Sequence, residues 1–305
     1  MRSHLLPSLL PFIGVTIATM HNFTTLETSS AKGVLTVTIN NKASKVNLIG
    51  QRVLAEIETL MDEVKDDAET KIVVFQSGNP TFFSAHYDFI PRETDLYPPG
   101  DPAMKDFAGK ILYKITSLRQ ATIAVIDGPA RGIANELIVA CDMRFASNKA
   151  ILGSPEVMIG INTAGGGFIN MARILGRARA LEYALSGQDV DAFEAEKLGW
   201  INKAFHSSSD LYRHVHNLTS RIALFPSESI ASIKSTINLV TKPTWDEIAL
   251  NGAEYRKLAQ GPEARELIGK FLKLSKNLTD VEVEKHLGDS ILEIYGDEST
   301  GDAGH

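Results

Sequence analysis

A stretch of small and apolar residues between Gly128 and Gly167 constrains the fold more than any other part of the chain. It begins with a turn rich in small residues (Gly128, Pro129, Ala130 and Gly132), where the backbone can come close to a ligand. A short helix is predicted from about Gly132 to Cys141, and it is almost wholly apolar apart from Asn135 and Glu136. A helix that is apolar all round is a buried helix, so the rest of the chain must fold around this segment.

Two carboxylates lie in this apolar stretch, Glu136 in the helix and Glu156 after it, and neither has a Lys or Arg beside it. Burying a carboxylate without a partner is costly. Each has a structural interpretation when it is taken alone. Glu136 lies near the N-terminus of its helix, where a negative charge is favourable, and Glu156 could cap a corner or pair with a distant Arg. Together, and flanked by Gly-rich turns that can direct N–H groups at a substrate, they favour acid/base catalysis.

The composition argues against several classes of partner. The net charge is −6 and the chain has no run rich in Lys and Arg, which argues against nucleic acid or an anionic membrane as the main partner. Cys141 is the single cysteine, so an internal disulfide is excluded, and no Cys/His cluster has the spacing of a metal site. Because Cys141 lies in the predicted buried helix, we expect a small core residue rather than a nucleophile.

The two ends of the chain differ from its middle. Residues 1–22 contain an apolar run from Leu5 to about Ala18 that is similar to a secretory signal peptide, although an organelle-targeting segment or a disordered tail would also fit. The run is too short and too rich in proline for a membrane span. We expect residues 297–305 to form a disordered tail, and this tail carries no Ser-Lys-Leu address to the peroxisome. The location therefore stays open between secretion, an organelle (mitochondrion or peroxisome) and the cytoplasm.

The order of the predicted elements divides the chain in two. Up to Gly167, strands alternate with helices: we expect strands at 33–40, 71–76, 122–127 and 143–147, and helices at 49–64, 103–118 and 132–141. Beyond that point helices dominate, with one strand-like segment at 200–205; the helices are expected at 168–174, 178–186, 192–198, 210–223, 226–240, 244–259, 263–275 and 280–294. This order predicts an α/β core over residues 23–209 and a helical C-terminal module over residues 210–296. Such a module often packs on a neighbouring subunit, so we expect it to serve oligomerisation.

A series of short motifs, in one order along the chain, resembles the crotonase superfamily, the enoyl-CoA hydratase/isomerase family, from about Gly33 to Lys276. The motifs are Asn40 with Asn47, Phe83-Ser84-Ala85-His86-Tyr87-Asp88, Gly128-Pro129-Ala130-Arg131-Gly132, Glu136-Leu137, Ala140-Cys141-Asp142-Met143-Arg144, Gly153-Ser154-Pro155-Glu156, Gly165-Gly166-Gly167, Gly176-Arg177-Ala178-Arg179-Ala180-Leu181-Glu182 and Ala192-x-Glu194-Ala195-x-x-x-Gly199. One such motif would be weak evidence, but so many in the same order are specific.

The resemblance implies a spiral of ββα units with a helical C-terminal module, assembled as a trimer or a dimer of trimers. It also implies an acyl-CoA thioester as substrate and no cofactor, because coenzyme A enters with the substrate. By alignment, the backbone N–H groups of Tyr87 and Ile133 form an oxyanion hole for the thioester oxygen. The two glutamates of the family's hydratases match Glu136, as the base on the water that attacks Cβ, and Glu156, as the acid that protonates Cα.

The resemblance further places substrate-binding residues on the loops of the site and a contact to coenzyme A on a lysine; these positions are Ala85, His86, Asp88, Gly132 and Ala164 for the substrate and Lys45 for coenzyme A. Several have structural interpretations. A loop histidine such as His86 is more often structural than catalytic, Asp88 is expected to fix its loop by accepting backbone N–H groups, and Lys45 could simply be solvated.

The sequence departs from the usual hydratase pattern around the site, which makes it a divergent member. The glycine triplet expected before the first glutamate is Gly132-Ile133-Ala134, and the β-branched side chain of Ile133 crowds the pocket. Small residues expected in the first oxyanion loop are His86 and Tyr87, and Thr163-Ala164 replaces Pro-Gly.

Three functions therefore stay open. The first is hydration of a trans-2-enoyl-CoA to a 3-hydroxyacyl-CoA, which the presence of both glutamates favours. The second is another enolate reaction of the superfamily, such as double-bond isomerisation, retro-aldol cleavage, decarboxylation or thioester hydrolysis. The third is a non-catalytic acyl-CoA-binding protein, which has no need of two carboxylates in apolar surroundings.

Overall fold

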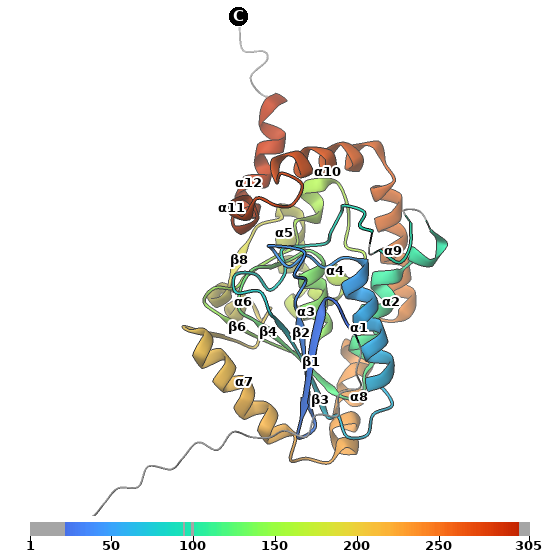
Figure 1. The fold of residues 1–305 in the computed structure, drawn as a ribbon, viewed down its shortest axis with the longest axis vertical. Coiled ribbons are helices and arrows are strands. Elements are labelled where there is room, and N and C mark those ends of the chain that lie inside the picture. The colour runs from blue at the N-terminus through green and yellow to red at the C-terminus, as the bar shows by residue number, and fades with distance from the viewer. Residues whose placement is uncertain (1–21, 94, 99–100, 299–305) are drawn as a thin grey trace, which may run out of the picture.

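The computed structural model describes residues 22–93, 95–98 and 101–298, so the predicted leader lies almost entirely outside the described residues. Its larger sheet has the strand order β1-β2-β3-β4-β6-β9, in which β1 and β2 are antiparallel and the other neighbours are parallel (Figure 1). The strands are β1 (Leu26–Ala31), β2 (Val34–Ile39), β3 (Ile72–Ser77), β4 (Ala121–Ile126), β6 (Met143–Ser147) and β9 (Lys203–Phe205).

Helices cover both faces of this sheet, which explains why β3 and β4 are apolar along most of their length. Val73 and Phe75 of β3 pack in the same core as the helices on one face, which are α1 (Gln51–Val64), α2 (Phe107–Ser117) and α3 (Ile133–Ala140). Ile72 and Val74 point to the opposite face, where α7 (Ser208–Ile222) packs. Strand side chains alternate between faces, so a single strand supplies both cores.

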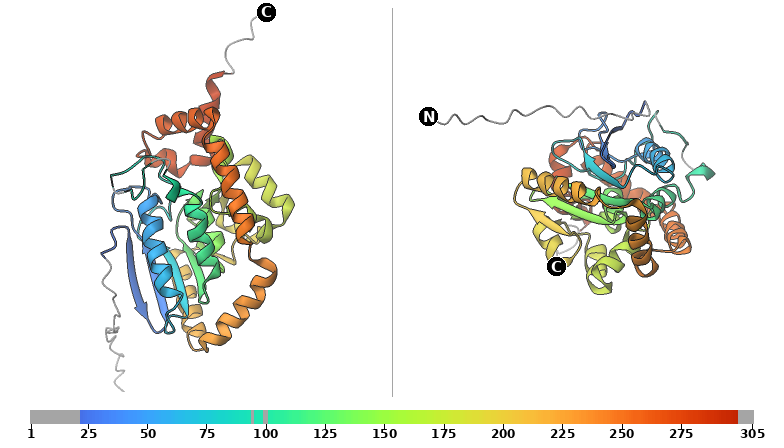
Figure 2. Two further views of the ribbon diagram at one scale, coloured as in Figure 1. Left: turned by 90° about the vertical axis from the view of Figure 1, so that its right-hand side faces the viewer. Right: turned by 90° about the horizontal axis from the view of Figure 1, so that it is seen from below.

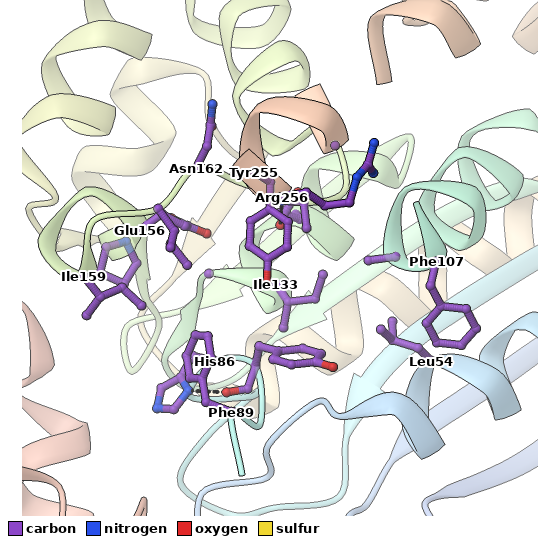
Figure 3. A pocket seen from close by; sticks show the side chains of 18 of the residues that line it. Leu54, His86, Phe89, Phe107, Ile133, Glu156, Ile159, Asn162, Tyr255 and Arg256 are labelled. Carbon is purple, nitrogen blue, oxygen red and sulfur yellow. Dashed lines mark hydrogen bonds between the residues drawn. The ribbon is translucent and has the colours of Figure 1, made fainter. Parts of the chain in front are cut away.

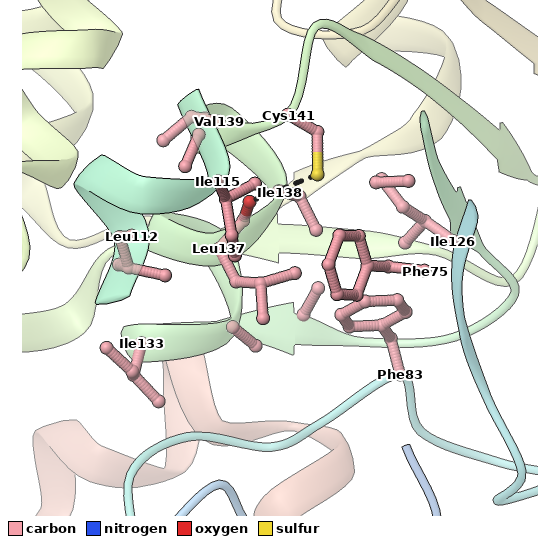
Figure 4. Packing of buried hydrophobic residues seen from close by; sticks show 14 of the residues in the cluster. Phe75, Phe83, Leu112, Ile115, Ile126, Ile133, Leu137, Ile138, Val139 and Cys141 are labelled. Atoms are coloured by element: carbon pink, nitrogen blue, oxygen red, sulfur yellow. Dashed lines mark hydrogen bonds between the residues drawn. The ribbon is translucent and has the colours of Figure 1, made fainter. Parts of the chain in front are cut away.

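The apolar helix α3 lies in the middle of the core that contains Val73, Phe75, α1 and α2, as its sequence predicts (Figure 4). Every residue of α3 is buried, and Leu137 and Ile138 pack with Phe75 and Phe83. Cys141, at the end of the helix, is a core residue: its Sγ donates to the Leu137 carbonyl at 3.5 Å. Burial raises the pKa of the Cys141 thiol to about 12, which disfavours the reactive thiolate.

A smaller sheet is formed by three short strands that lie between the strands and helices of the larger sheet in sequence. It has the order β5-β7-β8, with β5 (Ala130–Arg131) parallel to β7 (Ile151–Gly153) and β8 (Val190–Asp191) antiparallel to β7. Two short 3-10 helices, η1 (Pro102–Met104) and η2 (Pro155–Ile159), and the helices α4 (Gly167–Leu175), α5 (Arg177–Ser186) and α6 (Ala192–Leu198) complete the core region. The succession of strands and helices agrees with the spiral of ββα units that the family resemblance implies.

The C-terminal part is helical, also as predicted: α8 (Ser227–Thr241), α9 (Trp245–Ala259), α10 (Pro262–Leu274), α11 (Val281–Lys285), α12 (Leu287–Ser290) and η3 (Ile291–Glu298) follow α7. Helices α10 to α12 gather at one end of the molecule, and α7 and α8 extend to the other (Figures 1 and 2). None of the described helices is both long and apolar enough to cross a membrane. Of the tail predicted at 297–305, the first two residues continue η3 and the others lie outside the described residues.

Two predicted helices are interrupted in the structure. The helix predicted at 103–118 starts as η1 and breaks at Asp106, whose φ is 57° and whose carboxylate pairs with Arg256. The helix predicted at 280–294 breaks after Lys285 because the carbonyls of Glu284 and Lys285 accept hydrogen bonds from the Arg131 side chain. Those carbonyls are then turned away from the amides that would have continued the helix.

Candidate active site

The first candidate oxyanion donor, the N–H of Tyr87, lies on a loop that is paired with the start of α1. The Ile49 N–H donates to the His86 carbonyl at 3.2 Å, and the Asp88 N–H donates to the Ile49 carbonyl at 3.1 Å. Between these two bonds, the Tyr87 N–H has no hydrogen-bond partner among the described residues. The peptide is therefore held by its carbonyl while its N–H stays available to a ligand.

The second candidate donor is the N–H of Ile133. This residue is the first of α3, and the N–H groups of a first helical turn have no partner within the helix. Gly132 precedes it with φ 54° and ψ −124°, a conformation that favours glycine. The Gly132 N–H donates to the Gly153 carbonyl at 3.1 Å, and the loop is joined to the first one because the Phe83 and Ser84 amides both donate to the Pro129 carbonyl. The two candidate donors thus belong to one hydrogen-bonded unit.

Glu136 projects from α3 to the glycine-rich start of α4, where its carboxylate accepts three backbone N–H groups. Its Oε2 accepts from Gly165 at 2.6 Å and from Gly167 at 2.9 Å, and its Oε1 accepts from Ala164 at 3.2 Å. Burial raises the pKa of Glu136 to about 7, and the three N–H donors oppose this rise. Two carboxylate oxygens offer about four acceptor positions, so one position on Oε1 stays open for a water molecule.

Glu156 lies in η2 and is buried, but its carboxyl does not accept backbone N–H groups from other described residues as that of Glu136 does. Its Oε2 has no hydrogen-bond partner among the described residues. Burial raises the pKa of Glu156 to about 8, and the negative charge of Glu136 adds to the rise. Glu156 therefore holds its proton more tightly than Glu136, and Glu136 is the carboxyl that ionises first as the pH rises.

A buried polar cluster joins the two elements that carry the glutamates. The Asn135 side chain donates to Ser154 Oγ at 2.8 Å and accepts from Trp200 Nε1 at 3.1 Å. Asn135 directly precedes Glu136, Ser154 lies two residues before Glu156, and both are buried. These bonds set the position of η2 relative to α3.

The structure brings most of the predicted site residues into one pocket (Figure 3). The pocket is lined by both glutamates, both candidate donor residues and three of the predicted substrate-binding residues, namely Glu136, Glu156, Tyr87, Ile133, His86, Gly132 and Ala164. Its remaining wall is largely apolar, with Leu54, Phe89 and Phe107 among the lining side chains. A cavity of this kind suits an apolar acyl group beside a reacting centre.

Three other predicted residues do not line this pocket. Ala85 is fully buried in the neighbouring core. Asp88 accepts from the Ile90 N–H at 3.1 Å and pairs with Arg92 at 2.7 Å, which is the loop-fixing role expected for it. Lys45 is exposed, and its backbone carbonyl accepts a hydrogen bond from Asn79 Nδ2 at 2.9 Å.

Residues of the C-terminal helices also take part in the site, and these the sequence did not indicate. The Asn251 side chain of α9 accepts the Gly166 N–H at 2.9 Å and so holds the glycine-rich loop. Tyr255 and Arg256 line the pocket, and Figure 3 shows the Tyr255 ring reaching down from α9 toward Ile133. Burial, and then the charges of both glutamates, raises the pKa of the Tyr255 phenol. No local pattern marks these residues, because only the return of the chain brings them to the pocket.

In the described ranges, no group of three His, Cys, Asp or Glu side chains is placed to hold a metal ion.

Comparisons with known proteins identify the family. The family model for enoyl-CoA hydratase/isomerase matches residues 29–266. The short-chain-enoyl-CoA hydratase of Clostridium acetobutylicum is 25% identical over 207 residues, which cover 68% of this chain and 78% of that protein. A relative from Dictyostelium discoideum, whose name places it in the mitochondrion, is 26% identical over 220 residues, covering 72% of this chain and 78% of that protein. Relatives thus include both mitochondrial and bacterial proteins.

Solved structures agree. A crystal structure from Streptomyces avermitilis, provisionally described as an enoyl-CoA hydratase, is 32% identical and superposes with a TM-score of 0.79, covering 88% of this chain and 96% of that one. An enoyl-CoA hydratase/isomerase from Pseudoalteromonas atlantica is 22% identical with a TM-score of 0.74, covering 82% of this chain and 97% of that one, and it supports the fold alone. This chain therefore belongs to the enoyl-CoA hydratase/isomerase family of the crotonase superfamily and is an enzyme of that type.

Proposed function

We propose that this protein hydrates a trans-2-enoyl-CoA to a 3-hydroxyacyl-CoA, with Glu136 and Glu156 sharing the proton transfers. The observation that carries the proposal is the presence of two buried carboxyls in one pocket with unequal hydrogen-bond support. When the environments of two titratable groups give them different pKa values, one group can act as an acid and the other as a base at the same pH.

In the proposed reaction, ionised Glu136 takes a proton from water through the open position on Oε1 while the hydroxyl oxygen bonds to Cβ. The π electrons of the Cα–Cβ bond move toward the thioester carbonyl, and the negative charge on its oxygen is held by the N–H groups of Tyr87 and Ile133. Protonated Glu156 then gives its proton to Cα, which completes the addition of one water molecule. Transfer of a proton from Glu136 to Glu156, directly or through solvent, restores the starting state. Removing one oxyanion donor of this kind typically costs about 3 kcal/mol in activation free energy.

The apolar wall of the pocket supports an acyl group without charge. In Figure 3, Leu54 of α1 and Phe107 of α2 lie on the opposite side of the pocket from His86 and Ile159, and these two side chains give an acyl chain no polar partner. We therefore expect the substrate to combine a coenzyme A thioester with an apolar acyl group.

A second candidate function uses Glu156 alone. It is favoured by the three N–H groups that engage Glu136, because a carboxylate held in this way could serve only to fix the start of α4. A double-bond isomerisation, in which one carboxyl removes a proton at one carbon and returns it at another, would need no second glutamate.

The experiment that separates these functions follows the loss of the conjugated thioester absorbance of crotonyl-CoA for the wild type, Glu136→Gln and Glu156→Gln. We expect hydration by the wild type and at least a 100-fold loss of kcat in each variant, because each removes one proton carrier. Thermal melting and binding of a saturated acyl-CoA serve as controls that the variants are folded and still bind the thioester. Absence of hydration by a wild type that binds the thioester would contradict the proposal. Isomerase activity that survives in Glu136→Gln would support the second candidate, and a protein that binds but catalyses neither reaction would be a non-catalytic relative.

A further inference from the structure

The loop of Tyr87 is fixed by a buried contact with the C-terminal segment. His86 Nε2 lies 3.0 Å from Oε2 of Glu284 in α11, 198 residues further along the chain. The side chain of His86 is 5% exposed and that of Glu284 is 0% exposed. Glu284 Oε1 has no hydrogen-bond partner in the described part of the chain, so His86 is the only group that the carboxyl contacts through a hydrogen bond.

The other ring nitrogen of His86 fixes the neighbouring backbone. Its Nδ1 lies 2.7 Å from the Tyr87 carbonyl, and a carbonyl only accepts, so Nδ1 must carry a hydrogen. Nε2 then either donates to an ionised Glu284 or accepts from a protonated one, and both arrangements keep the ring in the same orientation. The His86 ring therefore links Glu284 to the peptide that directly follows the Tyr87 N–H.

The same turn of α11 also holds the second loop. The Glu284 carbonyl accepts from Arg131 Nη1 at 2.9 Å, and the Lys285 carbonyl accepts from Arg131 Nη2 at 3.0 Å. Arg131 is fully buried and is oriented by a bidentate pair with Asp189, at 2.6 and 2.7 Å. Arg131 lies just before Gly132 and Ile133, the residue of the second candidate donor.

We propose that Glu284 is a positioning residue that fixes the two N–H donors of the oxyanion hole relative to each other. Its side chain acts on the Tyr87 loop through His86, and its backbone carbonyl acts on the Ile133 loop through Arg131. The proposal rests on the oxyanion role of these two N–H groups. Because hydrogen bonds to a developing charge depend steeply on placement, a displacement of one loop lowers the rate of the chemical step more than it weakens substrate binding.

The test compares Glu284→Ala and Glu284→Gln with the control Glu282→Ala. Alanine removes the contact with His86 but keeps the backbone carbonyl. Glutamine keeps the shape, and its amide can donate to Nε2 of a neutral His86. Glu282 lies in the same helix, but its side chain is 73% exposed and its carboxylate pairs with Lys285. Kinetics are measured with crotonyl-CoA, and thermal melting is followed for every variant.

A second readout does not require hydration. The absorbance of bound cinnamoyl-CoA shifts to longer wavelength when its thioester carbonyl is polarised by the donors of an oxyanion hole. We expect Glu284→Ala to lower kcat about 10- to 100-fold, to change KM less than about 3-fold and to lose most of this shift. Glu284→Gln and Glu282→Ala should stay within about 3-fold of the wild type in kcat and keep the shift.

Several results would overturn the proposal. One is Glu284→Ala with wild-type kcat and an unchanged shift, and another is an increase in KM alone. If Glu284→Ala does not fold, Glu284→Asp takes its place, because the shorter side chain keeps a carboxyl but draws it away from His86 Nε2. A folded Glu284→Asp with wild-type kcat and an unchanged shift would contradict the positioning role. A wild type that shows the shift but no hydration would disprove the proposed function and leave the role of Glu284 testable by the shift.

Discussion

At the scale of single residues, the two glutamates of the pocket differ mainly in what surrounds their oxygens. Glu136 accepts three N–H groups, whereas Glu156 Oε2 is buried without a partner. The sequence predicted both residues and their shared pocket, because carboxylates in apolar stretches are rare enough to be informative. It could not predict the difference between them, since that depends on which backbone amides the folded chain brings within reach. The folded protein therefore disfavours the ionised form of Glu156, and this lowers the free energy of unfolding at a pH where the unfolded chain carries the ionised carboxylate.

This loss of stability predicts a pH-dependent gain in stability on substituting Glu156 by Gln. The pKa of Glu156 is raised in the folded state from 4.5 to about 8, so the folded protein binds its proton more tightly than the unfolded chain does. The protonated Glu156 therefore contributes its full stability to the folded wild type below pH 4.5, the pKa of Glu156 in the unfolded chain. This contribution is lost as the pH rises from there through about 8. We expect Glu156→Gln to melt about 2 °C or more above the wild type at pH 9, with a gap that closes as the pH falls toward 4.5. Thermal melting between pH 5 and 9 measures this, with the exposed Glu69→Gln as control. A gap that does not depend on pH, or a less stable variant at pH 9, would contradict the assignment.

At the scale of elements, local pattern identified most helices and strands but not those that depend on distant partners. The strand at Met143–Ser147 and the helix at Ala192–Leu198 have the bounds that the sequence predicts. Strand β1 was missed because it is an edge strand with mostly polar, exposed residues, which give no apolar alternation. The two-residue strands β5 and β8 both pair with β7, and β5 also forms a bridge to Ser84, so both depend on partners that are distant in sequence. The break in the helix predicted at 280–294 depends on Arg131, far away in sequence, and no local signal reveals it.

The start of α4 illustrates how an element sets the chemistry of a side chain, and it predicts the effect of adding one methyl group. A Cβ on Gly167 would lie 2.6 Å from Cγ of Glu136, so Gly167→Ala must displace that side chain from its N–H donors. We expect kcat for hydration to fall at least about 10-fold while KM changes little, because the proposed base, Glu136, would move relative to the reacting water. Steady-state kinetics with crotonyl-CoA measure this effect.

The control is Gly269→Ala in α10, where a Cβ would meet nothing within 4 Å. There the added methyl group should stabilise the helix by up to about 1 kcal/mol and leave kcat unchanged. Wild-type kcat in a correctly folded Gly167→Ala would show that the position of Glu136 does not limit the reaction.

At the scale of the whole molecule, the pocket and the outer surface raise different questions. The pocket is lined by side chains from Leu54 to Ile291, so one chain supplies a complete set of the proposed groups. The surface, in contrast, carries apolar side chains that a single chain leaves in water. Ile233, Ile237 and Val240 of α8 are 64%, 55% and 83% exposed and lie on one stripe of the helix. Exposed apolar stripes of this kind mark interaction sites more often than they mark free surface.

We propose that α8 packs against further copies of this chain, in the trimer or dimer of trimers expected for the family. Closed symmetric assemblies bury the same patch on every subunit, so a single charge there should act on each interface at once. We therefore expect wild-type protein to sediment as three or six chains, and Ile237→Asp to shift toward single chains because it would place an unpaired carboxylate in an apolar contact. Ser235→Asp adds the same charge at an exposed position of the same helix, away from the stripe, and should leave the assembly intact. Sedimentation equilibrium over a range of concentrations distinguishes these cases. A wild type that sediments as a single chain would contradict the assembly, and equal dissociation of both variants would show that α8 does not contact other copies through this stripe.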